Sequence, residues 1–207
     1  RRNEQGYPLE QSSKEKAAQY RRHWQAHILP HKGNNLGGVA FCWRDRLEGT
    51  ATWFGLTDIE NGLKPGYFAL KSLWTGSETL VETFDVFIVP PYYVDQRKSS
   101  YIFRLHSPAL HDPRIADKLN ILWYACEDGY LRHLSGLKVE EGAWACRVTY
   151  SAYGLDVRVY VRVETPSGVV MTASEPVFTP SGGKQYGAGD NVRPHTFLTS
   201  PPILGSW

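Results

Sequence analysis

The stretch GGVAFCWRDRLEGTATWFGLTDIENGLKPGYFALKSLW, from Gly37 to Trp74, changes from a strand pattern to a helix pattern. The run LGGVAFCW, residues 36–43, is short, apolar and bounded by glycines, which is typical of a strand covered on both faces. After a loop containing tryptophans and acids, residues 64–74 predict a helix that begins at Pro65. A covered strand needs neighbours on both sides, so the stretch predicts a larger sheet than it supplies itself.

The residues before this stretch predict a further helix. The segment SSKEKAAQYRRHWQAHIL, residues 12–29, starts with serine and continues with Lys, Glu and Ala, as helices commonly do. Pro30 and Gly33 are expected to end it. Its apolar residues recur at helical spacing and form a single stripe: Ala17, Tyr20, Trp24 and Ile28.

Two further regions follow the first, which spans residues 1–76. Residues 77–179 predict an all-β sandwich of the immunoglobulin or fibronectin type III kind, with turn residues between strands. Within 156–164 the valines alternate with Arg158, Tyr160 and Arg162, which predicts an antiparallel strand whose Arg/Tyr face is exposed. Residues 180–207 are rich in Gly, Pro and Ser and predict a flexible or surface-draped tail. The expected strands are 81–89, 99–105, 119–125, 143–150, 156–164 and 169–174.

The composition of the chain narrows the range of possible functions. The chain has 207 residues, of which 42% are hydrophobic and 21% charged, and its net charge of +2 gives little support to nucleic-acid binding. No apolar run reaches the roughly 18 residues of a membrane span. Aromatic residues are abundant at 13%, which suits either a large core or flat platforms for sugars. The three cysteines form no metal or dense disulfide pattern and leave the compartment open, with an extracytoplasmic or secreted location favoured.

The pattern GGVAFCWRD…WFGLTD…KPGYFALK resembles the last strand and helix of (β/α)8 glycoside hydrolases, closest to β-glycosidase families that use two glutamates. The likeness covers about the first third of the chain. It implies a mixed fold, in which an incomplete C-terminal segment of a (β/α)8 barrel precedes the immunoglobulin-like sandwich. The residues that carry it are Gly37, Gly38, Trp43, Asp45, Gly55, Leu56, Asp58, Lys64, Pro65, Tyr67, Ala69 and Leu70.

The resemblance also implies partners and a catalytic position. Glu4 stands where such enzymes carry the nucleophile, although only Arg1, Arg2 and Asn3 precede it and the general acid is missing. In this chain the favoured interpretation of Glu4 is a solvated terminal residue, because ordering falls off near chain termini. The implied partners are an oligo- or polysaccharide and an upstream polypeptide or partner chain that completes the barrel, with no cofactor. Because two carboxylates must flank the glycosidic bond, the isolated chain is expected to be inactive.

Three residues of the first region are candidate sugar contacts. Trp43 is expected either to form a sugar-stacking floor or to be a core residue at a strand end. Asp45 is expected either to bind sugar hydroxyls or to pair in solvent with Arg44 or Arg46. Trp53 is expected either to line a subsite or to pack against its own loop.

Histidines and cysteines give weaker signals. His23, His27 and His31 lie near one another, but a metal site needs further converging ligands, so a solvated helix face is favoured. Cys126 and Cys146 are expected to be small buried hydrophobic residues, with a disulfide as the alternative. No metal is expected.

The sequence therefore favours the C-terminal portion of an enzyme acting on β-linked glycans. Two alternatives stay open. The first is a non-catalytic sugar-binding or scaffolding module. A row of exposed aromatic residues on one face of the sandwich would support it. The second is a structural interaction domain with an apolar interface around Val39, Phe41 and Leu70.

Overall fold

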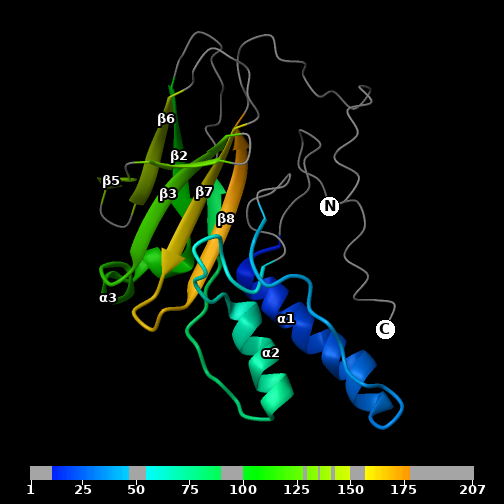
Figure 1. Ribbon diagram of the computed structural model, residues 1–207. Coiled ribbons are helices and arrows are strands. Elements are labelled where there is room, and N and C mark those ends of the chain that lie inside the picture. Colours follow the sequence, from blue (N-terminus) through cyan, green and yellow to red (C-terminus); the bar gives the residue numbers. More distant parts are fainter. Residues whose placement is uncertain are drawn as a thin grey trace.

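The computed structural model describes residues 11–46, 55–89, 100–127, 130–134, 136–140, 143–149 and 157–177. Figure 1 shows the sheets together on one side and the two longer helices beneath them. The helices are α1 (Ser13–His23), α2 (Pro65–Thr75) and the short α3 (Pro113–Ala116). The strands are β1 (Phe87–Val89), β2 (Ser100–His106), β3 (Asn120–Glu127), β4 (Tyr130–Leu134), β5 (Gly136–Glu140), β6 (Ala143–Thr149), β7 (Val157–Glu164) and β8 (Val170–Val177).

The described strands form two four-stranded sheets, in the orders β1-β2-β6-β5 and β4-β3-β7-β8. Every pairing between these strands is antiparallel. One hydrophobic core takes side chains from both sheets, including Phe103 and Val148 from the first and Trp123 and Val161 from the second. The predicted combination of helices with antiparallel sheets is confirmed, and the described strands close no barrel.

Local sequence signals explain both longer helices. The Ser12 hydroxyl accepts a hydrogen bond from the Glu15 backbone, and the Glu15 carboxylate accepts one from the Ser12 backbone, which together cap α1. Pro65 occupies the first turn of α2, and Gly76 ends that helix with a positive φ of 69°. After α1 the chain continues as a π-helical turn, Trp24–Ile28, and a 3-10 turn, Leu29–His31. The two predicted helices are confirmed.

The predicted strand at residues 36–43 is not a strand in the structure. The segment is extended, but no strand of the described chain lies beside it. Val39 is 74% exposed and Phe41 51% exposed, so the expected cover on both faces is also wrong for this chain. The physical reason is that no strand among the described residues pairs with residues 36–43, and a strand of a sheet needs such a neighbour to satisfy its backbone.

The first region packs directly on the second sheet. Leu63 forms a parallel bridge with Val169, and the Val170 amide donates to the Leu63 carbonyl at 2.9 Å. At the start of α1, Ser13 accepts a hydrogen bond from the Thr172 amide at 3.3 Å. The loop before α2 therefore lies along β8 and covers part of the sheet that the sequence predicted to face solvent.

Candidate functional site

The site begins where the extended segment ends. Trp43 is 59% exposed, but its backbone is fixed, because its carbonyl accepts hydrogen bonds from the Thr57 amide at 2.8 Å and the Thr57 hydroxyl at 3.0 Å. The Leu56 amide donates to the carbonyl of Cys42 at 3.0 Å. These bonds join the segment to the loop that precedes α2 and hold the backbone beneath an exposed indole.

The indole of Trp43 contacts the aromatic ring of Tyr67 in α2. Its ring centroid lies 6.0 Å from that of Tyr67, and the two planes meet at 85°. Tyr67 in turn makes an edge contact with Phe68, with centroids 5.3 Å apart. Edge-to-face contacts of this kind restrict ring orientation and add a modest stabilisation. Of the two alternatives for Trp43, the structure excludes a core position within the described chain.

Asp45 fits neither role proposed from the sequence. Its side chain is fully buried and forms an ion pair with the buried Lys64, with Nζ at 2.7 Å from Oδ2 and 3.0 Å from Oδ1. Oδ1 also accepts a hydrogen bond from the Gly55 amide at 2.6 Å. The carboxylate therefore neither faces a sugar nor pairs in solvent with Arg44 or Arg46. It anchors the backbone immediately after Trp43.

Gly55 is required by this anchor. A Cβ atom at position 55 would lie 2.2 Å from both the Asp45 nitrogen and the Thr57 oxygen. No real side chain tolerates such a contact with backbone, so only glycine lets the two segments approach this closely. Gly55, Asp45 and Lys64 thus form one local structure.

A second buried ion pair lies between the first region and β7. Arg162 donates from Nε to Oδ2 of Asp58 at 2.6 Å and from Nη1 to Glu164 at 2.7 Å. Asp58 also accepts the amides of Glu60 and Gly62 at 2.9 and 2.7 Å. Burial opposes the charge of Arg162, but hydrogen bonds and charge from Glu164 and Asp58 outweigh it and raise the pKa of Arg162.

The predicted exposed face of residues 156–164 is therefore wrong. Tyr160 is fully buried and Arg162 nearly so, because residues 58–62 cover them. The hydroxyl of Tyr124, on the neighbouring β3, donates to Glu60 at 2.5 Å. Burial, and then this hydrogen bond, raise the pKa of Tyr124 above its usual range. The acids of TDIEN, opposite an Arg/Tyr strand face, were the sequence signal that could have revealed this contact.

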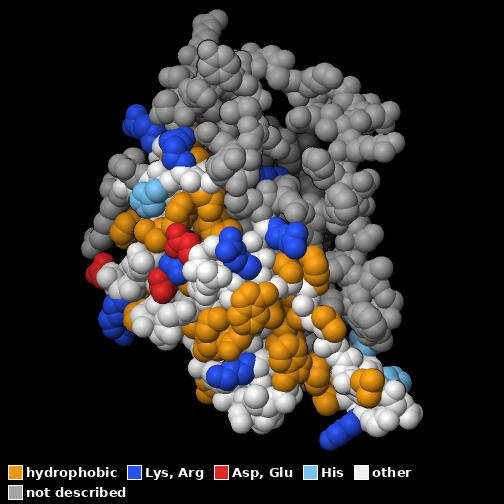
Figure 2. Space-filling model, viewed as in Figure 1, with side chains coloured by type: hydrophobic (Ala, Val, Ile, Leu, Met, Phe, Trp, Pro, Cys, Tyr) orange, Lys and Arg blue, Asp and Glu red, His pale blue; other side chains and the backbone are white. Residues whose placement is uncertain are grey.

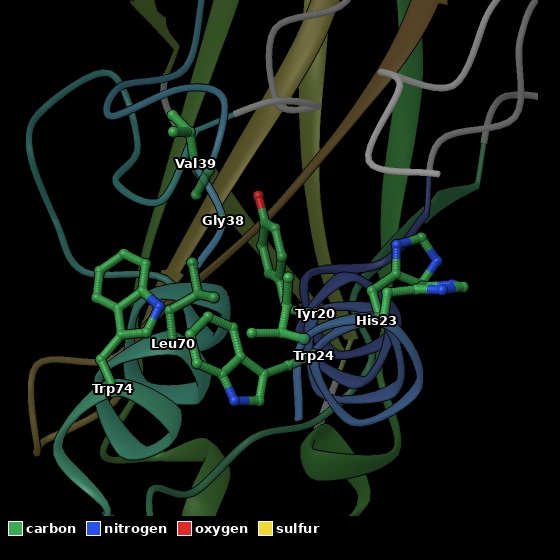
Figure 3. A pocket seen from close by; sticks show the side chains of 10 residues that line it. Tyr20, His23, Trp24, Gly38, Val39, Leu70 and Trp74 are labelled. Atoms are coloured by element: carbon green, nitrogen blue, oxygen red, sulfur yellow. The ribbon is translucent and has the colours of Figure 1, made fainter. Parts of the chain in front are cut away.

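A small hollow lies between α1, α2 and the extended segment. Its volume is about 50 Å³, and its lining is mostly apolar, with Tyr20, Trp24, Val39, Leu70 and Trp74 among the lining residues. The histidines His23 and His27 also line it. Figure 3 shows the Tyr20 hydroxyl directed toward the segment that carries Gly38 and Val39. This hydroxyl is buried and has no hydrogen-bond partner within the described chain. Burial is the main cause that raises the pKa of Tyr20.

Of the other residues singled out in the sequence, some lie outside the described residues and the rest are histidines and cysteines within them. Glu4 and Trp53 lie outside the described residues, so the position of the catalytic candidate stays a prediction. His23 and His27 lie edge to face with centroids 5.8 Å apart, and the described residues hold no group of three or more metal-ligating side chains. Cys126 and Cys146 are buried and are not joined in a disulfide, which agrees with the favoured prediction.

Comparison with protein-family models, with curated proteins and with solved structures finds no match for this chain. Among the described helices, none has the length and apolar character needed to cross a membrane.

Proposed function

We propose that this chain is the C-terminal portion of a carbohydrate-active enzyme that acts on β-linked glycans, in which Trp43 is a platform for a sugar ring. The observation that carries the proposal is an exposed indole on a fixed backbone. The segment that ends at Trp43 and the loop before α2, which follows it in the sequence, are hydrogen-bonded to each other directly beneath the indole.

Exposing an indole without a partner is unfavourable, because a tryptophan side chain offers a large apolar surface. Trp43 cannot move to bury its indole, since Thr57 hydrogen-bonds its backbone and the ring of Tyr67 restricts the orientation of the indole. Asp45 and Lys64 reinforce the same backbone from the buried side. A rigid, flat, apolar surface with polar backbone around it suits the carbon-bound hydrogens of a pyranose, whose hydroxyls stay hydrated at the ring edge.

The proposed reaction is hydrolysis or transfer at a glycosidic bond by two carboxylates. In a retaining mechanism the two groups stand roughly 5 to 5.5 Å apart on either side of the bond. The resemblance assigns one of them to Glu4 and the other to an earlier strand of the barrel, outside this chain. The chain alone is accordingly proposed to bind sugar at Trp43 without cleaving it.

Two features support the proposed domain types. The two helices α1 and α2 flank residues 36–43 in the chain order that a barrel portion would have, although these residues form no strand within the described chain, and in the proposed barrel Trp43 would stand at the end where sites are built. If the strands are lettered in chain order with β4 as C′, the two sheets have the orders ABED and C′CFG. This is the arrangement of immunoglobulin-like sandwiches, with one additional strand beside C.

The alternative of a sugar-binding sandwich has no comparable observation in its favour. Within the described parts of the two sheets, the large exposed hydrophobic residues are Phe87 and Val89 on β1, and they do not make an aromatic row. Trp123, Tyr124 and Tyr160 are buried. The proposed glycan contact therefore belongs to the first region.

The experiment is a binding comparison between two exposed tryptophans. Trp43 and Trp74 are 59% and 53% exposed, but only Trp43 lies at the end of the extended segment. Titration calorimetry with β-linked gluco-, xylo-, manno- and N-acetylglucosamine oligosaccharides should show binding of at least one series. Trp43→Ala should weaken it about tenfold or more, which corresponds to roughly 1.4 kcal/mol, and Trp74→Ala should leave it unchanged. Equal losses in both variants, or no binding of any series, would refute the proposal.

A further inference from the structure

The hydroxyl of Tyr20 is a buried polar group without a partner among the described residues. Only 5% of this residue is exposed, and its hydroxyl makes no hydrogen bond. The ring is held in place, because Leu56 and Leu70 belong to the same core cluster and a Cβ atom at Gly66 would lie 3.1 Å from its Cε2. Buried hydroxyls are normally paired, so this one points to a partner that the described chain does not supply.

The hollow beside Tyr20 gives a ligand access to this hydroxyl. Its lining residues belong to α1, the π-helical turn, the extended segment and α2, all of which are described parts of the chain. Figure 3 shows the hydroxyl close to the segment that carries Val39, with Leu70 and Trp74 on the opposite side of the hollow. Val39 is 74% exposed and Trp74 53% exposed, so the hollow opens to solvent at this rim.

The size of the hollow limits what it can hold. Its volume is about 50 Å³. On the same measure one water molecule needs roughly 10–15 Å³, so the hollow has room for about three or four non-hydrogen atoms. An acetyl group is of this size, whereas a sugar ring is larger. The hollow therefore fits a small functional group and not a whole pyranose.

The lining of the hollow favours a neutral group. Its basic side chains are those of His23 and His27, and no Lys or Arg is among the described residues that line it. Figure 2 shows hydrophobic side chains gathered over α2 and toward α1 on the visible face. A carboxylate or an ammonium group would lose its hydration here without a permanently charged partner, which is costly.

We propose that the hollow between α1, α2 and residues 38–40 binds the acetyl group of a small neutral amide or ketone, whose carbonyl oxygen accepts a hydrogen bond from the Tyr20 hydroxyl. A carbonyl group accepts this bond without adding a donor of its own. An alcohol of the same size would bring a hydroxyl proton that the apolar lining leaves unpaired, and an unpaired buried donor costs free energy.

The lining also determines how the ligand lies. Its methyl group packs against Trp24 and Leu70, which removes apolar surface from water. The remainder of the molecule extends into solvent past the exposed side chains of Val39 and Trp74. Trp43 is not among the lining residues, so this site is separate from the proposed sugar platform and does not depend on it.

A nuclear magnetic resonance titration of the 207-residue chain with N-methylacetamide and with acetone would measure this binding. The backbone amide signals of Val39 and Leu70 and the indole N–H signal of Trp24 should shift and saturate. Dissociation constants in the millimolar range are expected for ligands this small. The indole N–H signal of the buried Trp123 should stay unchanged. Acetate matches the acetyl group in size but carries a charge, and it should bind at least about tenfold more weakly.

Variants at two tyrosines and one glycine test the contacts. Tyr20→Phe should weaken binding of N-methylacetamide about three- to tenfold, the usual contribution of one hydrogen bond. Tyr160→Phe is the matched control, because it removes another buried, unpartnered hydroxyl from β7, outside the hollow, and should leave binding unchanged. Gly38→Ala adds a methyl group to the lining, 3.7 Å from Cδ1 of Ile28, and should weaken binding about threefold or more by filling part of the hollow.

Each other result overturns the proposal. No saturable shift at Val39 and Leu70 would mean that the hollow admits no such ligand. Equal binding of acetate would mean that the site does not select a neutral acetyl group. Equal effects of Tyr20→Phe and Tyr160→Phe would mean that the Tyr20 hydroxyl does not hold the carbonyl. The unfolding temperature of each variant separates lost binding from lost folding, and if Tyr20→Phe does not fold, unchanged binding in Gly38→Ala would still refute the site.

Discussion

Removing the guanidinium of Arg162 should destabilise the protein strongly, because it leaves a carboxylate buried without its counter-ion. The side chain of Asp58 is fully buried and its Oδ2 lies 2.6 Å from Nε of Arg162. Breaking a buried pair of this kind costs about 3–5 kcal/mol. Asp58 keeps the backbone amides of Glu60 and Gly62 on its other oxygen. We therefore expect Arg162→Met to lose about 3 kcal/mol, at the lower end of that range.

Urea denaturation of the wild type and three variants would measure this effect. Adding Asp58→Asn to Arg162→Met removes the unpaired charge and should recover part of the loss, about 1 kcal/mol or more. Arg114→Met is the matched control, because Arg114 also pairs with an aspartate, Asp112, at 2.7 Å but is 86% exposed. That variant should cause no detectable change. A loss below about 1 kcal/mol for Arg162→Met, or equal losses for both arginines, would mean that burial of the Asp58–Arg162 pair does not set its contribution to stability.

Three further outcomes follow from burial and close contact. Gly55→Ala should lose several kcal/mol or prevent folding, since its Cβ would lie 2.2 Å from the nitrogen of Asp45, and thermal unfolding measures this. Native thiol labelling at pH 8 should modify the partly exposed Cys42 and spare Cys146, because Cys146 is fully buried and burial raises its pKa to about 12; equal labelling rates would contradict this. Burial raises the pKa of Tyr160 in the folded protein, so the unfolded chain loses this proton at a lower pH. The free energy of unfolding should therefore fall above about pH 10. A free energy of unfolding that stays constant from about pH 9 to 11 would contradict this expectation.

The parts of the fold that follow local signals could be predicted from the sequence. Ser12 and Pro65 mark the starts of the two helices, and both helices form there. Strict alternation of valines in residues 156–164 indicated β7. The short strands β4 and β5 escaped prediction: residues 130–134, YLRHL, do not alternate strictly between apolar and polar side chains, and residues 136–140, GLKVE, alternate over only four positions. Their pairing depends on neighbouring strands and not on propensity.

The candidate site was harder to predict because its key interactions join distant residues. The Asp45–Lys64 pair spans a loop, and the Asp58–Arg162 pair joins residues more than a hundred positions apart. Sequence periodicity assigns a face to Arg162 but cannot tell what covers that face. The sequence left Trp43 between a sugar contact and a core position, and only the structure shows that its side chain is 59% exposed.

The two buried ion pairs have one consequence in common. Asp45–Lys64 fixes the loop before α2 to the residues after Trp43, and Asp58–Arg162 fixes the same loop to β7. The second sheet thus supports the backbone beneath the proposed sugar platform through two successive contacts. Breaking one buried pair disturbs both regions, which is why we expect loss of stability and not of a single local contact.

The most direct test of the proposed function is a nuclear magnetic resonance titration that follows the indole N–H signals of the tryptophans. A ¹⁵N spectrum of the 207-residue chain, with the Trp43 signal assigned from its absence in Trp43→Phe, would be followed during addition of β-linked oligosaccharides. If Trp43 is the sugar platform, its signal should show a saturable shift, and the signal of the buried Trp123 should stay unchanged. A titration in which the Trp43 signal stays fixed for every oligosaccharide series, or in which only Trp123 moves, would contradict it.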